Sequence, residues 1–255
     1  MKIDKVLVSS DDNPLYLDFW ESCSRTWKDK MGIEPVLLYF GNQSPTERHG
    51  KVVRIEPSKK YPLYLQTLWV RYWYPRTEPD ACFCVSDIDM YPLNRDYFTK
   101  MIKDWPQNFH GHLTSYSQPW PSCYHVGLGS TFQKLFSLPE SFEDSLAELM
   151  AFSNKRALTP HPEFGFKDWG VDESYASFKL SENERNKTSV HLPYVPVAKL
   201  DRHPSARRLD RSNWNFREED IARGMYLDCH SIRPYTDHQE SIERVLAAIP
   251  EYKPQ

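Results

Sequence analysis

The chain lacks the features that mark several large classes of protein. It has no apolar run of 18 residues, and its first residues run straight into a strand pattern, so we expect neither a transmembrane segment nor a signal peptide. Its 32 Lys and Arg against 35 Asp and Glu give a net charge of −3, which argues against a nucleic-acid partner. These absences and the length of 255 residues predict a single folded domain, residues 1–255, in the cytoplasm.

Cysteine and glycine are both scarce. The five cysteines, at positions 23, 82, 84, 123 and 229, form an odd and scattered set that suits buried thiols in a reducing compartment better than disulfides. Only nine glycines are present, and none lies in residues 9–13, after the first apolar run. Nucleotidyltransferases of a related fold need a glycine-rich phosphate loop at that place, so the sequence argues against that class.

The first half of the chain alternates between strand and helix patterns. Apolar runs predict strands at residues 5–9, 35–40, 51–55 and 82–85, and helical patterns occupy residues 14–30 and 63–74. This spacing predicts βαβ units and a Rossmann-like, mainly parallel α/β sheet flanked by helices.

The second half is less regular, and we expect a smaller mixed region there. Helical patterns lie at residues 97–105, 141–150, 172–180 and from 236 onward, and strand patterns lie at 109–116, 122–130 and 224–229. Residues 181–224 are polar and read as an extended loop region with short elements.

Two aspartates, Asp87 and Asp89, follow directly after the apolar run of residues 82–85. If that run is a buried strand, both acids lie at its carboxyl end, where open α/β sheets hold their ligands. Two carboxylates this close repel each other unless a cation lies between them, and hard divalent cations prefer carboxylate oxygens. The alternative is an ordinary loop entry without a metal.

Two later segments complete a pattern with residues 85–90, which read Val-Ser-Asp-Ile-Asp-Met. Residues 169–174 read Trp-Gly-Val-Asp-Glu-Ser, and residues 230–235 read His-Ser-Ile-Arg-Pro-Tyr. In this order the three segments resemble the Asp-x-Asp signature, the acidic catalytic segment and the late histidine segment of GT-A-type glycosyltransferases, the last in its glycogenin-like form. The late segment is at least two residues shorter than the glycogenin-like pattern and lacks its glycine.

The resemblance implies a metal-dependent glycosyltransferase that moves a sugar from a nucleotide-diphosphosugar, usually UDP-linked, to a glycan, glycoprotein or other hydroxyl acceptor. It divides the domain into a nucleotide-binding half, about residues 1–95, and an acceptor-binding half, about residues 96–255. It further implies that Asp89 binds Mn²⁺ or Mg²⁺, that Asp87 holds the metal or the ribose hydroxyls, and that His230 is the third ligand. A nitrogen ligand favours Mn²⁺. The alternative for His230 is a hydrogen-bonded loop histidine.

The resemblance also implies a set of nucleotide contacts, which includes the end of the first strand: Ser9, Asp11, Asp12, Arg71, Asp87 and Arg233. For Asp11 and Asp12 the alternative is an interaction with the dipole of the following helix, and for Arg71 it is a solvated helix face.

Asp172 and Glu173 are the candidate catalytic residues, and helix capping is their alternative role. An inverting enzyme needs a general base and a retaining enzyme can use a carboxylate near the anomeric carbon, and the residues leave both open. The resemblance places Trp169 and His125 on the acceptor side.

Three further questions stay open. The 14% aromatic content fits core packing or stacking on sugars. The cluster of Arg202, Arg207, Arg208 and Arg211 is either a solvated loop or a lid over the donor phosphates. The alternative functions are a non-catalytic carbohydrate-binding protein and a phosphoryl or nucleotidyl transferase that uses the Asp-x-Asp pair.

Overall fold

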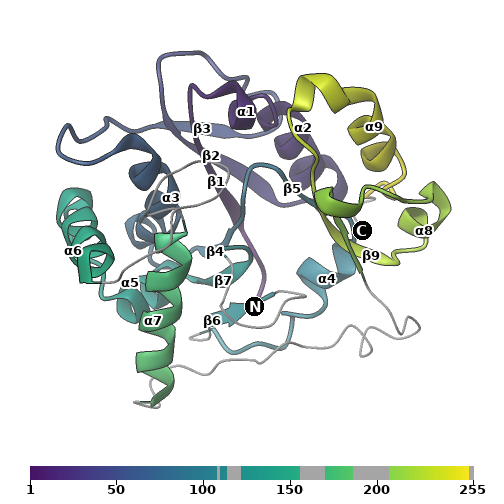
Figure 1. The fold of residues 1–255 in the computed structure, drawn as a ribbon. Coiled ribbons are helices and arrows are strands. Elements are labelled where there is room, and N and C mark those ends of the chain that lie inside the picture. The colour runs from purple at the N-terminus through teal and green to yellow at the C-terminus, as the bar shows by residue number, and fades with distance from the viewer. Residues whose placement is uncertain (108–109, 114–121, 156–169, 186–206, 253–255) are drawn as a thin grey trace.

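A computed structural model describes residues 1–107, 110–113, 122–155, 170–185 and 207–252 (Figure 1). Within these ranges the main sheet has the strand order β3-β2-β1-β4-β7-β6. Its strands are β1 (Lys5–Asp11), β2 (Glu34–Phe40), β3 (Lys51–Arg54), β4 (Cys82–Val85), β6 (His110–His112) and β7 (His125–Leu128). The strands β1 to β4 run parallel, whereas β7 is antiparallel to β4 and β6. The predicted mainly parallel α/β sheet is confirmed.

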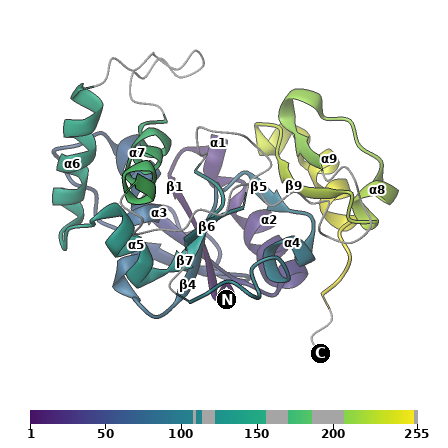
Figure 2. The ribbon, with the colours of Figure 1, turned by 90° about the horizontal axis from the view of Figure 1, so that it is seen from below.

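Helices cover both faces of the main sheet (Figures 1 and 2). One face carries α3 (Leu63–Trp73), α5 (Gly129–Phe136), α6 (Phe142–Lys155) and α7 (Val171–Arg185). The other carries α1 (Pro14–Leu17), α2 (Trp20–Arg25) and α4 (Arg95–Thr99). The helices α8 (Glu218–Ala222) and α9 (Tyr235–Ala247) lie beyond them, beside the smaller sheet (Figure 2). On α3 the buried residues Leu65, Trp69 and Tyr72 recur at helical spacing, and Trp69 packs against the rings of Phe136 in α5 and Tyr175 in α7. Large aromatic side chains thus build much of the core.

A smaller sheet has the order β5-β9-β8 and lies beside α9 (Figure 2). Its strands are β5 (Met90–Pro92), β8 (Arg207–Asp210) and β9 (Tyr226–His230). Strand β9 pairs antiparallel with β5 and parallel with β8. This mixed sheet confirms the smaller mixed region that the sequence predicts, and β5 follows Asp89 directly.

Three local predictions are wrong. Residues 14–30 do not form one α-helix. The helix α1 ends at Leu17, α2 spans Trp20–Arg25, and a π-helix, η1 (Thr26–Met31), follows it. The helix expected at residues 97–105 is only the short α4, whose first turn is capped by the side chain of Asn94. The strand expected to reach residue 130 ends at residue 128, because the N–H groups of Gly129 and Ser130 donate to the loop before β4 and α5 begins there. Two further short helical turns are η2 (Tyr74–Thr77) and η4 (Arg211–Asn213).

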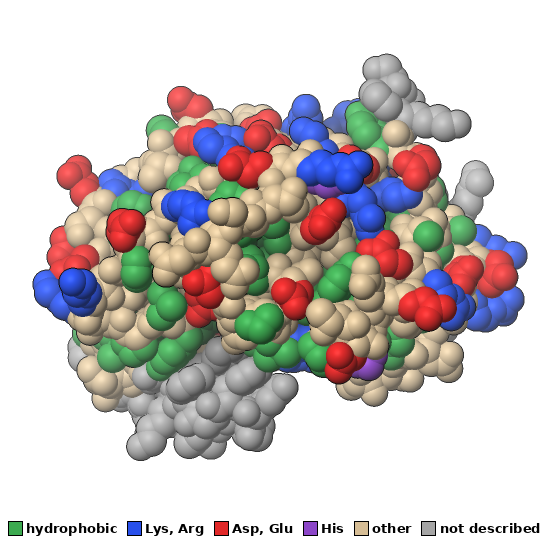
Figure 3. All heavy atoms as spheres, turned by 90° about the horizontal axis from the view of Figure 1, so that it is seen from above, with side chains coloured by type: hydrophobic (Ala, Val, Ile, Leu, Met, Phe, Trp, Pro, Cys, Tyr) green, Lys and Arg blue, Asp and Glu red, His purple; other side chains and the backbone are tan. Residues whose placement is uncertain are grey.

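The surface carries both signs of charge. Acidic and basic side chains alternate across the face shown in Figure 3 without a field of one sign. Within the described residues, no helix is both long enough and apolar enough to cross a membrane.

Candidate active site

A pocket of about 540 Å³ lies at the carboxyl ends of β1 and β4. The strand order reverses here, because β2 and β3 follow on one side of β1 while β4 lies on its other side. Open α/β sheets bind ligands at such a switch point. The pocket is lined by Ser9, Ser10, Asp11, Asn13, Tyr16, Tyr64, Thr67, Leu68, Arg71, Asp87, Ile88, Asp89, Ser122, Gly170, Asp172, Glu173, Arg211, His230 and Arg233. Nine of the twelve site residues proposed from the sequence therefore line one cavity.

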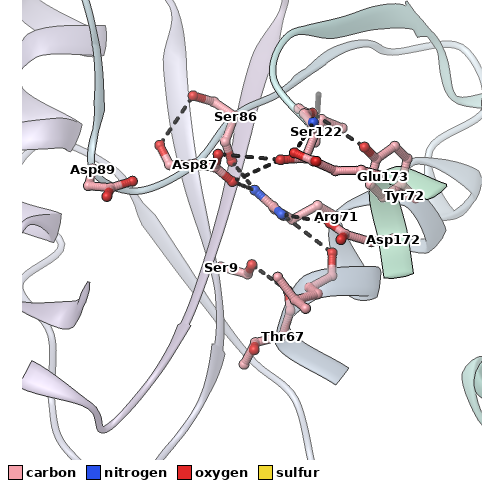
Figure 4. Close-up of polar contacts among 12 residues, drawn as sticks. Ser9, Thr67, Arg71, Tyr72, Ser86, Asp87, Asp89, Ser122, Asp172 and Glu173 are labelled. Carbon is pink, nitrogen blue, oxygen red and sulfur yellow. Dashed lines mark hydrogen bonds and ion pairs between the residues drawn. The ribbon is translucent and has the colours of Figure 1, made fainter. Parts of the chain in front are cut away.

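Local folding explains how the two aspartates reach this cavity. The four residues of β4 are buried, and the N–H of Ser86 extends the ladder by donating to the carbonyl of Leu7 at 2.9 Å. The chain then turns, with the N–H of Met90 donating to the carbonyl of Asp87 at 3.2 Å. The carboxylates of Asp87 and Asp89 point toward different groups of residues (Figure 4).

Asp87 belongs to a chain of polar contacts among buried and half-buried groups (Figure 4). The guanidinium of Arg71, whose side chain is 3% exposed, forms an ion pair with Asp87 and places Nη2 3.3 Å from Oδ2 of Asp172. The hydroxyl of Ser122 donates to Asp87 at 3.3 Å, and its backbone N–H donates to Oε1 of Glu173 at 2.9 Å. The contacts show that Arg71 is a buried counter-ion and not part of a solvated helix face.

Crowding of acids around one arginine shifts the proton affinities. Burial raises the pKa of Asp172 to about 7; the charge of Arg71 opposes this shift, whereas Glu173 and Asp87 add to it. Burial also raises the pKa of Glu173. One guanidinium cannot neutralise three carboxylates, so the protonated forms of Asp172 and Glu173 are favoured relative to free carboxyl groups. A carboxyl group with a pKa near 7 suits proton transfer at neutral pH.

We expect Asp172→Asn to flatten the pH dependence of stability. The folded protein holds the Asp172 proton up to about pH 7, whereas the unfolded chain releases it near pH ~4. Between these values the folded state binds more protons, so the contribution of this group to the free energy of unfolding falls as pH rises. Urea unfolding at several pH values from 4 to 8 measures this slope, with the exposed Glu240→Gln as the matched control. A slope that is equal in wild type and Asp172→Asn contradicts the raised pKa.

His230 reaches the pocket through the smaller sheet, from 141 positions beyond Asp89. Strand β5 pairs Met90 with His230, and the N–H of Ser231 donates to the carbonyl of Asp89 at 2.9 Å. As a result, Nε2 of His230 lies 3.6 Å from Oδ2 of Asp89. On the other side, β8 pairs Asp210 with His230, and the Asp210 carboxylate lies 3.3 Å from Nδ1.

Three cations surround the buried carboxylate of Asp89. Besides His230, Nη1 of Arg211 lies 3.6 Å and Nε of Arg233 lies 3.7 Å from the same oxygen. Although burial alone would raise it, these neighbours hold the pKa of Asp89 below its usual value. Burial would lower the pKa of His230, but Asp210 and Asp89 raise it to about 9. At neutral pH this corner of the pocket therefore carries excess positive charge.

The side chains in this part of the pocket suit a divalent cation only in part. The carboxylate of Asp89 and the imidazole of His230 lie close enough to share one ion, and an imidazole must be deprotonated to bind it. Asp87 instead directs its carboxylate at Arg71 and Ser122. Among the described residues no group of three or more His, Cys, Asp or Glu is arranged to hold a metal ion. The three-ligand site thus stays a prediction that requires Asp87 to turn.

Two predicted site residues lie outside the pocket lining. The carboxylate of Asp12 accepts hydrogen bonds from the Tyr39 hydroxyl and from the N–H groups of Asn42 and Gln43, so it holds the loop after β2 instead of facing the cavity. His125 is fully buried and its Nδ1 lies 3.1 Å from Nε2 of His110, which gives it a packing role instead of an acceptor contact. The sequence could not reveal this burial, because His125 is a polar residue in a short strand.

Of the other predicted residues, some line the cavity and some lie outside the described residues. Ser9 lines the cavity while its hydroxyl donates to the carbonyl of Thr67, and Asp11 lines it beside the α1 N-cap. Trp169 and Arg202 lie outside the described residues. Arg207 begins β8.

The two remaining members of the arginine cluster have different environments. Arg208 is not in a solvated loop, because it is buried in an ion pair with Asp228. Arg211 contacts Asp89 in the pocket.

Sequence reasoning missed several residues of the site. Ser122, Asp210 and Tyr16 carry no motif: Ser122 and Tyr16 line the cavity, and Asp210 contacts His230 from outside the lining. Their contacts with Asp87, His230 and Arg233 join segments far apart in the sequence.

Comparison with known proteins identifies the fold. No protein-family model and no curated protein sequence matches the chain. The glycosyltransferase GlyE of Streptococcus pneumoniae TIGR4 superposes with a TM-score of 0.52 at 10% identity, over 98% of this chain and 62% of that one. The galactosyltransferase LgtC, solved with donor and acceptor sugar analogs, gives a TM-score of 0.52 at 11% identity, over 98% of both chains. This chain thus spans less than two thirds of GlyE, and the likeness to both shows the fold of GT-A glycosyltransferases.

Proposed function

We propose that the protein is a metal-dependent glycosyltransferase that moves a sugar from a nucleotide-diphosphosugar, most simply a UDP-sugar, to a hydroxyl group of a glycan or glycoprotein. The observation that carries this proposal is the gathering of Asp87, Asp89 and His230 in one cavity at the switch point of the sheet. A fold shared with glycosyltransferases supports it.

The two sides of the pocket suit two different parts of the reaction: binding of the donor diphosphate and proton transfer from the acceptor. The corner around Asp89, with Arg211 and Arg233, carries the guanidinium groups that an anionic diphosphate requires. Asp89 and His230, with Asp87 after a turn of its side chain, would hold Mn²⁺ or Mg²⁺. The bound ion would supply Lewis-acid neutralisation of the departing diphosphate.

The opposite side of the pocket suits proton transfer. Asp172 and Glu173 lie at the start of α7, and both carboxyl groups have raised pKa values. A carboxylate there would accept the proton of an acceptor hydroxyl, and Arg71 would orient Asp172 through the ion pair at 3.3 Å. Trp169 remains the proposed stacking partner of the acceptor sugar.

Nucleotide binding gives a direct test against the carbohydrate-binding alternative. We expect UDP with Mn²⁺ to raise the melting temperature, because a ligand at a hundred times its dissociation constant adds about 2.7 kcal/mol, which is about 5 °C or more for a chain of this size. The measurement is a thermal shift with UDP, GDP and free sugars, each with and without Mn²⁺. A protein that responds to free sugars but to neither nucleotide would be a lectin-like module, and the proposal would fail.

A further inference from the structure

Arg211 differs from the other two cations beside Asp89 in how it is held. Arg233 donates from Nη1 to the Tyr16 hydroxyl at 2.8 Å, and its guanidinium lies over the Tyr16 ring, 5.3 Å from the centroid. His230 is held by Asp210. Each of these two groups therefore has a second partner that fixes its position.

The Nη1 atom of Arg211 is buried and has no hydrogen-bond partner among the residues that the structure describes. It lines the cavity, 3.6 Å from Asp89, which is too far for a hydrogen bond. A buried N–H donor without a partner costs free energy, more so when it carries charge. Such a donor is stabilised when an anionic oxygen enters the cavity.

The local charge points to the same kind of ligand. Arg211 and Arg233 place two guanidinium groups beside the single carboxylate of Asp89, so one positive charge is left over for an anionic ligand. The planar guanidinium also matches the oxygens of a phosphate better than an ammonium group does. Arg211 follows β8 immediately, so the smaller sheet fixes its backbone while its side chain remains 33% exposed.

We propose that Arg211 binds the diphosphate of the donor through Nη1 and gives nucleoside diphosphate binding a component that needs no metal ion. This inference rests on the proposed function. It assigns a role to a residue outside the Asp-x-Asp and late histidine segments. The metal would still be required for turnover, whereas binding of the nucleotide would persist in part after chelation.

The test is titration calorimetry in excess EDTA with UDP and UMP, and in parallel with GDP and GMP. We expect Arg211→Gln to weaken diphosphate binding about tenfold, while monophosphate binding changes less than about twofold because its one phosphate lies next to the ribose. Arg211→Lys keeps the positive charge but lacks the planar set of N–H donors, so it should lose part of the affinity for the diphosphate. Arg217→Gln removes an equally charged side chain that is exposed and does not line the cavity, and it should bind like wild type.

The outcomes separate this inference from the proposed function. Suppose that wild type binds UDP or GDP with Mn²⁺, and that in EDTA the Arg211→Gln variant binds this nucleotide as tightly as wild type does. The role of Arg211 is then wrong and the proposed function stands. Equal loss of monophosphate and diphosphate affinity also contradicts a contact with the second phosphate. If wild type binds neither nucleotide under any condition, both proposals fail. Because the side chain is partly exposed, the variants should fold, and their melting temperatures check this.

Discussion

Replacement of Asp89 by Asn is expected to reduce hydrolysis and transfer of the donor sugar about a thousandfold or more while the protein stays folded. The substitution keeps the shape of the side chain but removes the one negative charge that three cations share. It also removes the carboxylate that would bind the metal with His230. The release of UDP or GDP from their sugar conjugates measures the loss, and circular dichroism checks the fold.

A matched control separates this effect from a general loss of charge. Asp144→Asn removes an exposed carboxylate from the first turn of α6, outside the pocket lining, and should keep the wild-type rate within about twofold. Retention of most activity by Asp89→Asn, or activity of that variant in excess chelator, contradicts the metal-binding role of Asp89.

Replacement of Arg71 by Met is expected to lower the free energy of unfolding by about 3–5 kcal/mol, more than any of the other single substitutions. The side chain is 3% exposed, and its removal leaves Asp87 and Asp172 without their shared counter-ion. Methionine is a good helix former of similar length, so α3 itself should persist. Urea denaturation at pH 7 measures the change.

The double variant Arg71→Met with Asp172→Asn tests the cause of this loss. Removal of one unpaired carboxylate should recover part of the stability, which gives a coupling energy between the two positions. The exposed Arg217→Gln should change stability by less than about 0.5 kcal/mol. A loss of less than about 1 kcal/mol in Arg71→Met would mean that the buried ion pairs contribute little, contrary to the geometry of this site.

The sequence predicts the place of a residue in the fold when that place follows from the pattern of its neighbours along the chain. The buried run before Asp87 and Asp89 is a strand because it is apolar and short, and the strand end is where such sheets bind ligands. The acids at the start of α7 also lie where the resemblance to the acidic segment predicts, within the same cavity.

The parts that sequence could not predict depend on pairing between distant segments. The hydrogen-bond register of β5, β8 and β9 brings Asp210 and Arg211 beside His230, and no periodicity in the polar segment before residue 224 signals β8. Asp12 and Asp11 are adjacent acids at one strand end, yet only Asp11 lines the cavity, because the Tyr39 hydroxyl on the neighbouring strand takes up Asp12. Local chemistry is the same for both acids, and only tertiary contacts distinguish them.

The most direct measurement is the hydrolysis of nucleotide sugars by the wild-type protein, with Mn²⁺ and with excess EDTA, followed by NMR of the released sugar to assign its anomeric configuration. We expect at least one UDP-sugar or GDP-sugar to be cleaved with Mn²⁺, and cleavage to cease in EDTA and in Asp89→Asn. If no nucleotide sugar is cleaved, or if Asp89→Asn cleaves it as fast as wild type, the pocket at the ends of β1 and β4 is not the site of glycosyl transfer.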